Sequence, residues 1–210
     1  MPGPAPEVLA AEAALALRED VLAPLIATHG PCPIGSGRRT RSHFEALARS
    51  ITFQQLAGRA AQTIWERTRS LVDGPFTAPA VLTVGEERLR SAGLSGSKAR
   101  AMLDLADQVA ARRVRLDTIG RRDDETVIAE LSQVWGIGRW TAEMFLMFQL
   151  GRLDVWPTGD LGVRNGYARA WGMAESPGPG ELEEYGERFR PWRSIVAWYC
   201  WRALDVLPPA

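Results

Sequence analysis

The chain has 210 residues, of which 46% are hydrophobic and 24% charged, and its net charge at neutral pH is zero. This composition is typical of a folded globular protein. Its two cysteines, Cys32 and Cys200, and two histidines, His29 and His43, exclude a disulfide scaffold, a four-cysteine zinc or iron–sulfur site and a multi-histidine metal centre. No apolar run approaches the roughly 18 residues that span a bilayer, and no secretory signal is visible, so we expect an intracellular, cytoplasmic protein.

Charge is unevenly distributed along the chain. Residues 38–69 carry seven arginines against two glutamates, a net +5, and residues 98–115 carry a net +3. Residues 175–187 contain five glutamates and no basic residue. This segregation predicts either a basic face suited to a polyanion or ordinary solvated helix faces, and both interpretations stay open. The zero net charge taken alone argues mildly against a nucleic-acid partner.

Helical periodicity dominates the sequence, and alternating strand patterns are nearly absent, so we expect an all-α fold. A first helix is predicted over about residues 7–28, and a loop rich in Gly and Pro follows at 30–40. Helical patterns start at Ser42 and resume after Gln55. Later helices are predicted at 80–89, from a cap at Ser97, from a cap at Asp123 or Asp124 up to Gly136, at 139–150, from near Asp160, at 181–189 and at 192–204.

The most informative segment is LSQVWGIGRWTAEMFLMFQLGRLDVWPTGDLGVRNG, residues 131–166. Two amphipathic helices are joined by a very short turn with glycines at 136 and 138. Glycine permits positive φ and leaves backbone N–H groups open at the start of the next helix, where the helix dipole favours an anion. The pattern therefore predicts a helical hairpin that can bind phosphate.

These residues resemble the DNA-3-methyladenine glycosylase II family of the helix-hairpin-helix DNA glycosylase superfamily. The family's G-I-G-R-W-T-A hairpin matches residues 136–142, and its catalytic aspartate, twenty residues beyond the hairpin tryptophan Trp140, matches Asp160. A second motif, R-P-W-R-S, matches residues 190–194, with Trp201 seven residues past the serine. A third, weaker match is ITFQQLAGRAA at residues 51–61, and the resemblance covers roughly residues 20–204.

The resemblance implies a two-lobed helical bundle with its active site in the cleft between the lobes. One lobe, with the hairpin, is expected at about residues 42–157, and the other at 7–41 and 158–204. Together they form a single glycosylase unit over 1–204, followed by a tail at 205–210. The chain is therefore expected to be a short form that lacks the N-terminal β domain of some members.

The implied activity is base-excision repair of alkylated purines, such as 3-methyladenine and 7-methylguanine, in duplex DNA after base flipping. Asp160 is implied to stabilise the positive charge that develops on the sugar as the N-glycosidic bond breaks. Trp140, Trp201 and Met144 are implied to form the base pocket, where electron-rich rings favour a cationic purine. Because Trp140 stands where lyases of the superfamily carry a Schiff-base lysine, we expect no lyase activity.

The departures from the family pattern concern single side chains. Trp135 stands where proline usually precedes the first hairpin glycine, and Met144 stands where some members have an aromatic residue. Of the other tryptophans, Trp65 and Trp198 are examples that we expect to lie in the core.

The resemblance also implies residues that contact DNA. In the hairpin these are Gly136, Ile137, Gly138, Arg139 and Thr141. In the glutamine-rich loop, Gln55 is the implied wedge that fills the gap left by the flipped base, and Leu56 or Gln54 is the next choice.

The family further implies a monovalent cation, Na⁺ or K⁺, held by the backbone carbonyls of Ser132, Val134 and Ile137. No other cofactor is expected, and an iron–sulfur cluster is not. The expected partner is double-stranded DNA with alkylated bases, without a membrane, and the chain is expected to act as a monomer.

Two alternatives come from other classes of protein. A non-catalytic helix-hairpin-helix DNA-binding module accounts for the hairpin but for neither Asp160 nor Trp201. An all-α protein-interaction domain with chance motifs predicts no DNA binding even in low salt.

Overall fold

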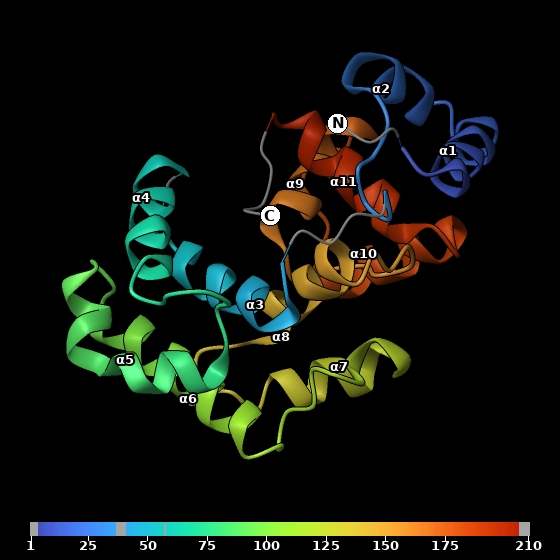
Figure 1. Ribbon diagram of the computed structural model, residues 1–210. Helices are drawn as coiled ribbons and strands as arrows, with labels where there is room; N and C mark the ends of the chain where they lie inside the picture. The colour runs from blue at the N-terminus through green and yellow to red at the C-terminus, as the bar shows by residue number, and fades with distance from the viewer. Residues whose placement is uncertain (1–3, 37–40, 57, 206–210) are drawn as a thin grey trace. The chain divides into compact units, whose positions relative to one another are not determined.

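The computed structural model describes residues 4–36, 41–56 and 58–205, and these residues form helices and loops without a strand (Figure 1). The predicted all-α fold is confirmed for this part of the chain. None of its helices is long and apolar enough to cross a membrane. The described residues divide into unit 1, with residues 4–36 and 146–205, and unit 2, with residues 41–56 and 58–145.

Unit 2 contains the hairpin. Its helices are α3 (His43–Phe53), α4 (Gly58–Arg69), α5 (Ala78–Ser91), α6 (Gly96–Ala110), the 3-10 turn η1 (Ile119–Arg121), α7 (Asp124–Leu131) and α8 (Arg139–Met144) (Figure 1). As predicted, α3 begins after Ser42, whose hydroxyl accepts the Glu45 N–H, and α7 begins after Asp123, whose carboxylate accepts the Thr126 N–H. The apolar stripes of these helices supply a core that includes Leu47, Ile51, Met102 and Leu105.

Two predicted boundaries in unit 2 need correction. Ser95, not Ser97, caps α6, because the Ser95 hydroxyl accepts the Lys98 N–H at 3.3 Å, while the Ser97 hydroxyl bonds to that of Ser95. The helix predicted over 139–150 is α-helical only to Met144 and continues as the π-helical turn η2 (Phe145–Gln149). A single turn of five residues, four of them apolar, is too short for sequence periodicity to separate π from α geometry.

Unit 1 consists of α1 (Pro6–Arg18), α2 (Leu22–His29), most of η2, α9 (Leu161–Ala170), α10 (Pro179–Gly186), η3 (Glu187–Phe189) and α11 (Arg193–Ala203). The single helix predicted over 7–28 is wrong, because the chain breaks after Arg18 and Glu19 is extended with φ of −136°. The Glu19 carboxylate accepts the Trp171 indole N–H at 3.2 Å and pairs with Arg188 at 3.1 Å. These partners are remote in sequence, so the local pattern could not reveal the break.

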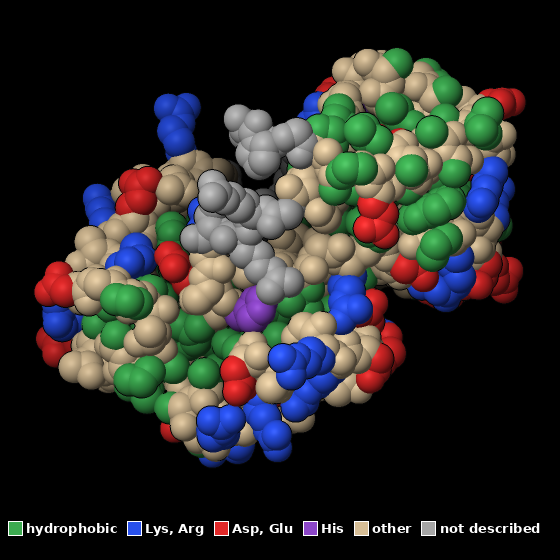
Figure 2. Space-filling model, turned by 45° about the vertical axis from the view of Figure 1, so that its right-hand side comes forward, with side chains coloured by type: hydrophobic (Ala, Val, Ile, Leu, Met, Phe, Trp, Pro, Cys, Tyr) green, Lys and Arg blue, Asp and Glu red, His purple; other side chains and the backbone are tan. Residues whose placement is uncertain are grey.

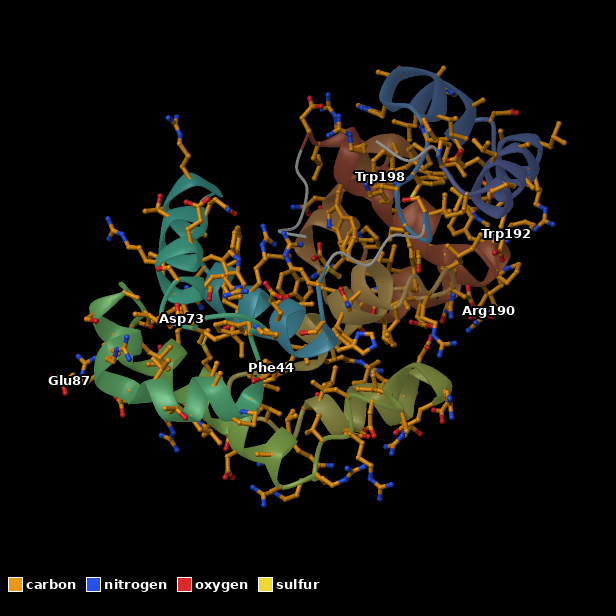
Figure 3. The ribbon with its side chains drawn as sticks, in the orientation of Figure 1. Phe44, Asp73, Glu87, Arg190, Trp192 and Trp198 are labelled. Atoms are coloured by element: carbon orange, nitrogen blue, oxygen red, sulfur yellow. The ribbon has the colours of Figure 1, made fainter. Side chains whose placement is uncertain are left out.

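The core of unit 1 is centred on α11. All of its residues from Arg193 to Trp201 are buried, which is why its sequence shows almost no polar face. Figure 3 labels Trp198 on this helix, and Arg190 and Trp192 just before it. The expectation that Trp65 and Trp198 are core residues is confirmed, with exposed fractions of 5% and 6%.

Residues 146–157 belong to unit 1 in the structure, whereas the sequence prediction grouped them with the hairpin lobe. The R-P-W-R-S motif provides the physical reason. The Ser194 hydroxyl donates to the Arg152 carbonyl and accepts the Val155 N–H, both at 2.8 Å, and the Ser194 N–H donates to the Leu153 carbonyl at 2.9 Å. The Trp156 indole N–H donates to the Leu182 carbonyl at 2.7 Å. Contacts with the C-terminal helices therefore decide where this segment belongs.

The basic runs of unit 2 are partly neutralised in place. Figure 2 shows Lys and Arg side chains in small groups over this unit, with Asp and Glu among them. Arg112 pairs with Asp117 at 3.3 Å, Arg113 pairs with Asp107, and Arg69 pairs with Glu45 at 3.4 Å. For these arginines the structure favours the interpretation of solvated, ion-paired helix faces.

Candidate active site

The hairpin joins α7 to α8 through residues 132–138. Gly136 has φ of +84°, and a Cβ at this position would lie 2.9 Å from the Ala101 Cβ on α6, so both the backbone and the space require glycine. Gly138 has an ordinary φ of −96°, and no atom lies within 4 Å of the position of its Cβ. It caps α8 without a side-chain bond, and this open helix start suits an approaching anion.

Gln54 clamps this turn from the end of α3. Its Nε2 donates to the Gly136 carbonyl at 3.0 Å and to the Thr141 hydroxyl at 3.3 Å. The Gln54 amide is therefore used inside unit 2. Gln55 and Leu56 are exposed, and Gln55 has a left-handed φ of +56°, which is uncommon for a residue with a Cβ.

A hollow of about 600 Å³ lies beside this turn. Its lining residues are Phe53, Gln54, Gln55, Leu56, Gly136, Gly138, Trp140 and Thr141. The structure thus brings together the predicted wedge loop, the hairpin glycines and Trp140, which is half-buried. Ile137 has 3% of its surface exposed, and its side chain packs in the core. A contact of Ile137 with DNA or a cation would therefore be made by its backbone atoms.

Two predicted site residues of unit 2 have other contacts. The Arg139 guanidinium makes a bidentate pair with Glu125, with distances from 2.7 to 3.2 Å, and a further pair with Glu143 at 3.4 Å. It therefore ties α8 to α7. Met144 is 4% exposed and does not line this hollow, so its predicted place in the base pocket stays a prediction.

Asp160 lies in unit 1 at the start of α9, where the sequence predicted a helix to open. Its Oδ1 accepts the Val163 N–H at 2.8 Å and the Trp201 indole N–H at 3.0 Å. Donors from α9 and α11 thus hold one carboxylate oxygen, and the N-terminus of α9 stabilises its negative charge. Burial raises the pKa of the neighbouring Cys200 thiol, and the charge of Asp160 raises it further, so this cysteine is not a nucleophile.

Trp201 is 1% exposed, and its ring lies 6.1 Å from that of Phe148. The ring is buried, and its predicted stacking on a base stays a prediction. The structure shows it as the hydrogen-bond donor that orients Asp160. Sequence reasoning assigned a role to the ring and missed the role of its N–H, because the two residues are 41 positions apart.

Two glycines on α9 make this contact possible, and the sequence prediction missed them. A Cβ on Gly162 would lie 2.7 Å from the Trp201 Cδ1, and one on Gly166 would overlap the Cys200 carbonyl. Their spacing, Gly162-x-x-x-Gly166, places both on one helix face. In the sequence, this spacing of two glycines would have indicated that another helix packs closely against α9.

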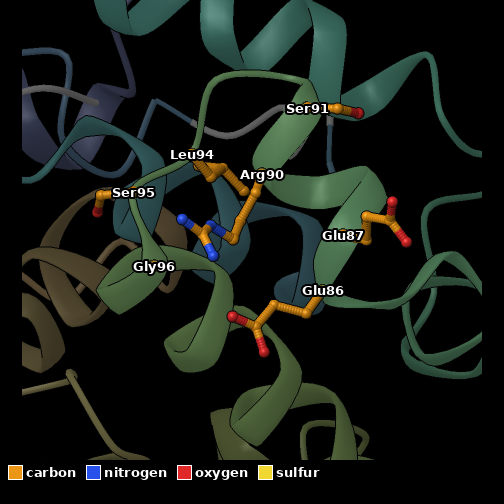
Figure 4. Close-up of a pocket in the computed structure, with 7 residues that line it drawn as sticks. All are labelled: Glu86, Glu87, Arg90, Ser91, Leu94, Ser95 and Gly96. Atoms are coloured by element: carbon orange, nitrogen blue, oxygen red, sulfur yellow. The ribbon is translucent and has the colours of Figure 1, made fainter.

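A second hollow, of about 700 Å³, lies beside the start of α6 and is shown in Figure 4. Its lining residues are Glu86, Glu87, Arg90, Ser91, Leu94, Ser95 and Gly96. These residues include two carboxylates and one guanidinium, and none of them is aromatic. This hollow suits neither a phosphate nor a flipped base as well as the hollow beside the hairpin.

A sequence model of the HhH-GPD superfamily of base excision DNA repair proteins matches residues 48–191. The chain belongs to this superfamily. DNA-3-methyladenine glycosylase 1 of Schizosaccharomyces pombe is 33% identical over 177 residues, which cover 80% of this chain and 78% of that protein.

Solved structures of HhH-GPD relatives have the same fold as this chain. The 3-methyladenine DNA glycosylase Mag1 of S. pombe, in complex with abasic DNA, matches with a TM-score of 0.80 and 28% identity over 95% of this chain and 98% of that one. A DNA-3-methyladenine glycosidase from Bacillus halodurans matches with a TM-score of 0.80 and 32% identity over 95% and 89% of the two chains. The fold is therefore that of the HhH-GPD superfamily.

Proposed function

We propose that this HhH-GPD protein is a monofunctional DNA glycosylase that hydrolyses the N-glycosidic bond of alkylated purines in duplex DNA. The observation that carries the proposal is the position of the Asp160 carboxylate. Its Oδ1 accepts hydrogen bonds from the Val163 N–H and the Trp201 indole N–H. In this superfamily member, Asp160 stands twenty residues after Trp140. The names of the relatives from S. pombe and B. halodurans support 3-methyladenine as a substrate.

In the proposed reaction a water oxygen forms a bond to C1′ as the bond from C1′ to the base breaks. The electron pair of that bond leaves with the base, and one proton of the water is released. Positive charge develops on the sugar, and the fixed carboxylate of Asp160 stabilises it. A purine made cationic by alkylation leaves as a neutral base, so this reaction needs little acid catalysis.

Unit 2 supplies the residues for DNA binding in this proposal. The open start of α8 receives a phosphate through backbone N–H groups, and the exposed Gln55 fills the space left by the flipped base. Trp140, on the wall of the hollow, offers its ring to a cationic purine. Trp201 acts as a positioning residue that orients Asp160.

The residues of the turn also fit a monovalent cation, which we keep as part of the proposal. The Ile137 N–H donates to the Val134 carbonyl at 3.0 Å, so two of the three implied carbonyl residues lie in one tight turn. With the Ser132 carbonyl they would hold Na⁺ or K⁺. A bound cation would supply positive charge beside the phosphate.

The proposal includes an absence of lyase activity, because few side-chain amines are available. The indole of Trp140 cannot form an imine, and Lys98 is the only lysine in the sequence. Its Nζ donates to the Thr52 carbonyl at 2.7 Å. Borohydride reduction with abasic DNA should therefore trap no covalent complex, and an adduct on Lys98 would overturn this part of the proposal.

The decisive experiment incubates the protein with methylated duplex DNA and identifies released bases by chromatography. Release of 3-methyladenine by the wild type, lost in Asp160→Asn, supports the proposal. Binding of undamaged duplex without any release would indicate the non-catalytic DNA-binding module instead. Absence of both in low salt would indicate a protein-interaction domain.

A further inference from the structure

The loop that follows α3 holds a backbone conformation that local sequence does not favour. Gln54 ends the helix with φ of −51° and ψ of 129°, and Gln55 follows in the left-handed region with φ of +56°. For a residue with a Cβ this conformation is sterically unfavourable, and it persists only where neighbouring contacts impose it. Gln55 is also exposed, so burial of its own side chain does not impose it.

Lys98 is placed to impose this conformation from one side. Its Nζ donates to the Thr52 carbonyl at 2.7 Å, in the last turn of α3. Carbonyls in the last turn of a helix have no partner within the helix, and a cation satisfies both the carbonyl and the negative end of the helix dipole.

The position of Lys98 in its own helix is unfavourable. It lies in the first turn of α6, three residues after the cap Ser95, where the positive end of the helix dipole disfavours a cation. Desolvation lowers its pKa. Helix propensity therefore does not account for this lysine, whereas the contact with α3 does.

Gln54 holds the same loop from the other side, because its amide bonds to the Gly136 carbonyl and the Thr141 hydroxyl of the hairpin. The loop is thus tied to α6 through Lys98 and to the hairpin through Gln54. Both bonds are made just before Gln55 in the chain, so they fix the backbone from which the exposed Gln55 extends.

We infer that Lys98 is a positioning residue for base flipping, which fixes the end of α3 so that Gln55 is held ready to enter the duplex. The inference rests on the proposed function and deepens it. Lys98 itself touches neither the base nor the sugar in this inference, and it acts through Gln55.

The test compares Lys98→Met, which keeps the length but loses the charge, with Lys98→Arg, which keeps both the charge and the donors. We expect Lys98→Met to slow single-turnover base release about tenfold, because misplacement of a group in the site slows the step. Lys98→Arg should restore the rate to within about threefold. Binding of undamaged duplex should change little in either variant.

Arg69→Met is the matched control. Arg69 is another cation that donates to backbone carbonyls at a helix end, those of Val72 at 3.1 Å and Gly74 at 2.6 Å. Its loss should lower stability without slowing base release. If Arg69→Met slows release as much as Lys98→Met does, the effect of Lys98 is a general loss of stability and the inference fails.

A double-mutant cycle with Gln55→Ala tests whether Lys98 acts through Gln55. In the Gln55→Ala background Lys98→Met should cause no further loss of rate. Multiplicative effects of the two substitutions would overturn the inference. So would a weaker affinity of Lys98→Met for undamaged duplex with a salt slope reduced by about one, because Lys98 would then contact a phosphate.

Hydrogen exchange in the free protein gives a readout that does not depend on activity. Lys98→Met should speed exchange at the amides of Gln54, Gln55 and Leu56, and Lys98→Arg should not. If the wild type releases no base, the proposed function fails, and exchange at these amides still shows whether Lys98 fixes the loop. If the wild type releases base and Lys98→Met matches it, only the inference fails.

Discussion

Unit 1 and unit 2 hold their candidate site residues by different means. In unit 1, Asp160 is a single side chain whose Oδ1 is fixed by donors from α9 and α11. In unit 2, the hairpin offers backbone N–H groups. The shape of the hairpin depends on the small space around Gly136 and on the hydrogen bond from the Gln54 amide. A carboxylate that stabilises a developing positive charge must be negatively charged and must lie close to the atom on which the charge develops. A phosphate contact made by backbone tolerates changes of side chain but not changes of backbone shape.

The comparison predicts that the largest loss of activity comes from Asp160. Asp160→Asn should reduce base release by at least about 100-fold, because a neutral amide cannot stabilise the developing charge. Asparagine is also a good helix cap, so Tm and affinity for undamaged duplex should stay near those of the wild type. Release within tenfold of the wild type would contradict the assigned role.

In unit 2 the corresponding test changes the backbone. Gly136→Ala meets both a positive φ and a contact of 2.9 Å with Ala101, so unit 2 should lose about 2–4 kcal/mol of stability and duplex binding should weaken. Gly138→Ala, with no atom within 4 Å of its Cβ position, is the matched control and should lose only about 1 kcal/mol, because alanine is a poorer helix cap than glycine. Equal Tm losses in the two variants would contradict this account.

A substitution of Trp140 separates recognition of the flipped base from binding of the DNA backbone. Trp140→Ala should slow release of cationic 3-methyladenine about tenfold, because a cation–π contact is lost, and slow release of neutral hypoxanthine less. Affinity for an abasic product should change little, since that product has no base. Single-turnover rates on both lesions provide the measurement, and an equal loss on both would exclude the charge-based selectivity.

Trp201 tests the positioning of Asp160 with a smaller expected effect. Trp201→Phe keeps an aromatic ring but removes the N–H that donates to the Asp160 Oδ1 at 3.0 Å, so base release should slow about fivefold. Gln54→Leu is a contrasting variant, because it removes the hairpin clamp and should weaken duplex binding instead. An unchanged release rate in Trp201→Phe would show that the ring only packs.

The smallest effect is expected at Asp123, which caps α7 ahead of the hairpin. Hydrogen bonds from the Thr126 hydroxyl and N–H lower the pKa of this carboxyl, so its contribution to stability is present at neutral pH. It should be lost as the pH falls through that lowered pKa. Asp123→Asn should therefore show a slightly lower Tm than the wild type at neutral pH, and the difference should vanish in acid. A difference that persists in acid would contradict the electrostatic origin.

Local features of the sequence predicted the helical class, the hairpin and the helix start at Asp160. These depend on interactions between residues three or four positions apart, such as the contact of Asp123 with Thr126 and that of Asp160 with Val163. The break after Arg18 and the assignment of residues 146–157 to unit 1 could not be predicted, because both depend on partners far along the chain.

The amino-acid sequence by itself determined that this protein is helical, carries a glycine hairpin and places Asp160 at a helix start, because periodicity and capping are short-range. Only the tertiary structure decided that Trp201 donates to Asp160, that Arg139 is bound by Glu125 and that Lys98 reaches the end of α3. Each of these contacts joins residues from 14 to 46 positions apart. Folding alone brings such residues within hydrogen-bond distance, and no local pattern records which pairs will meet.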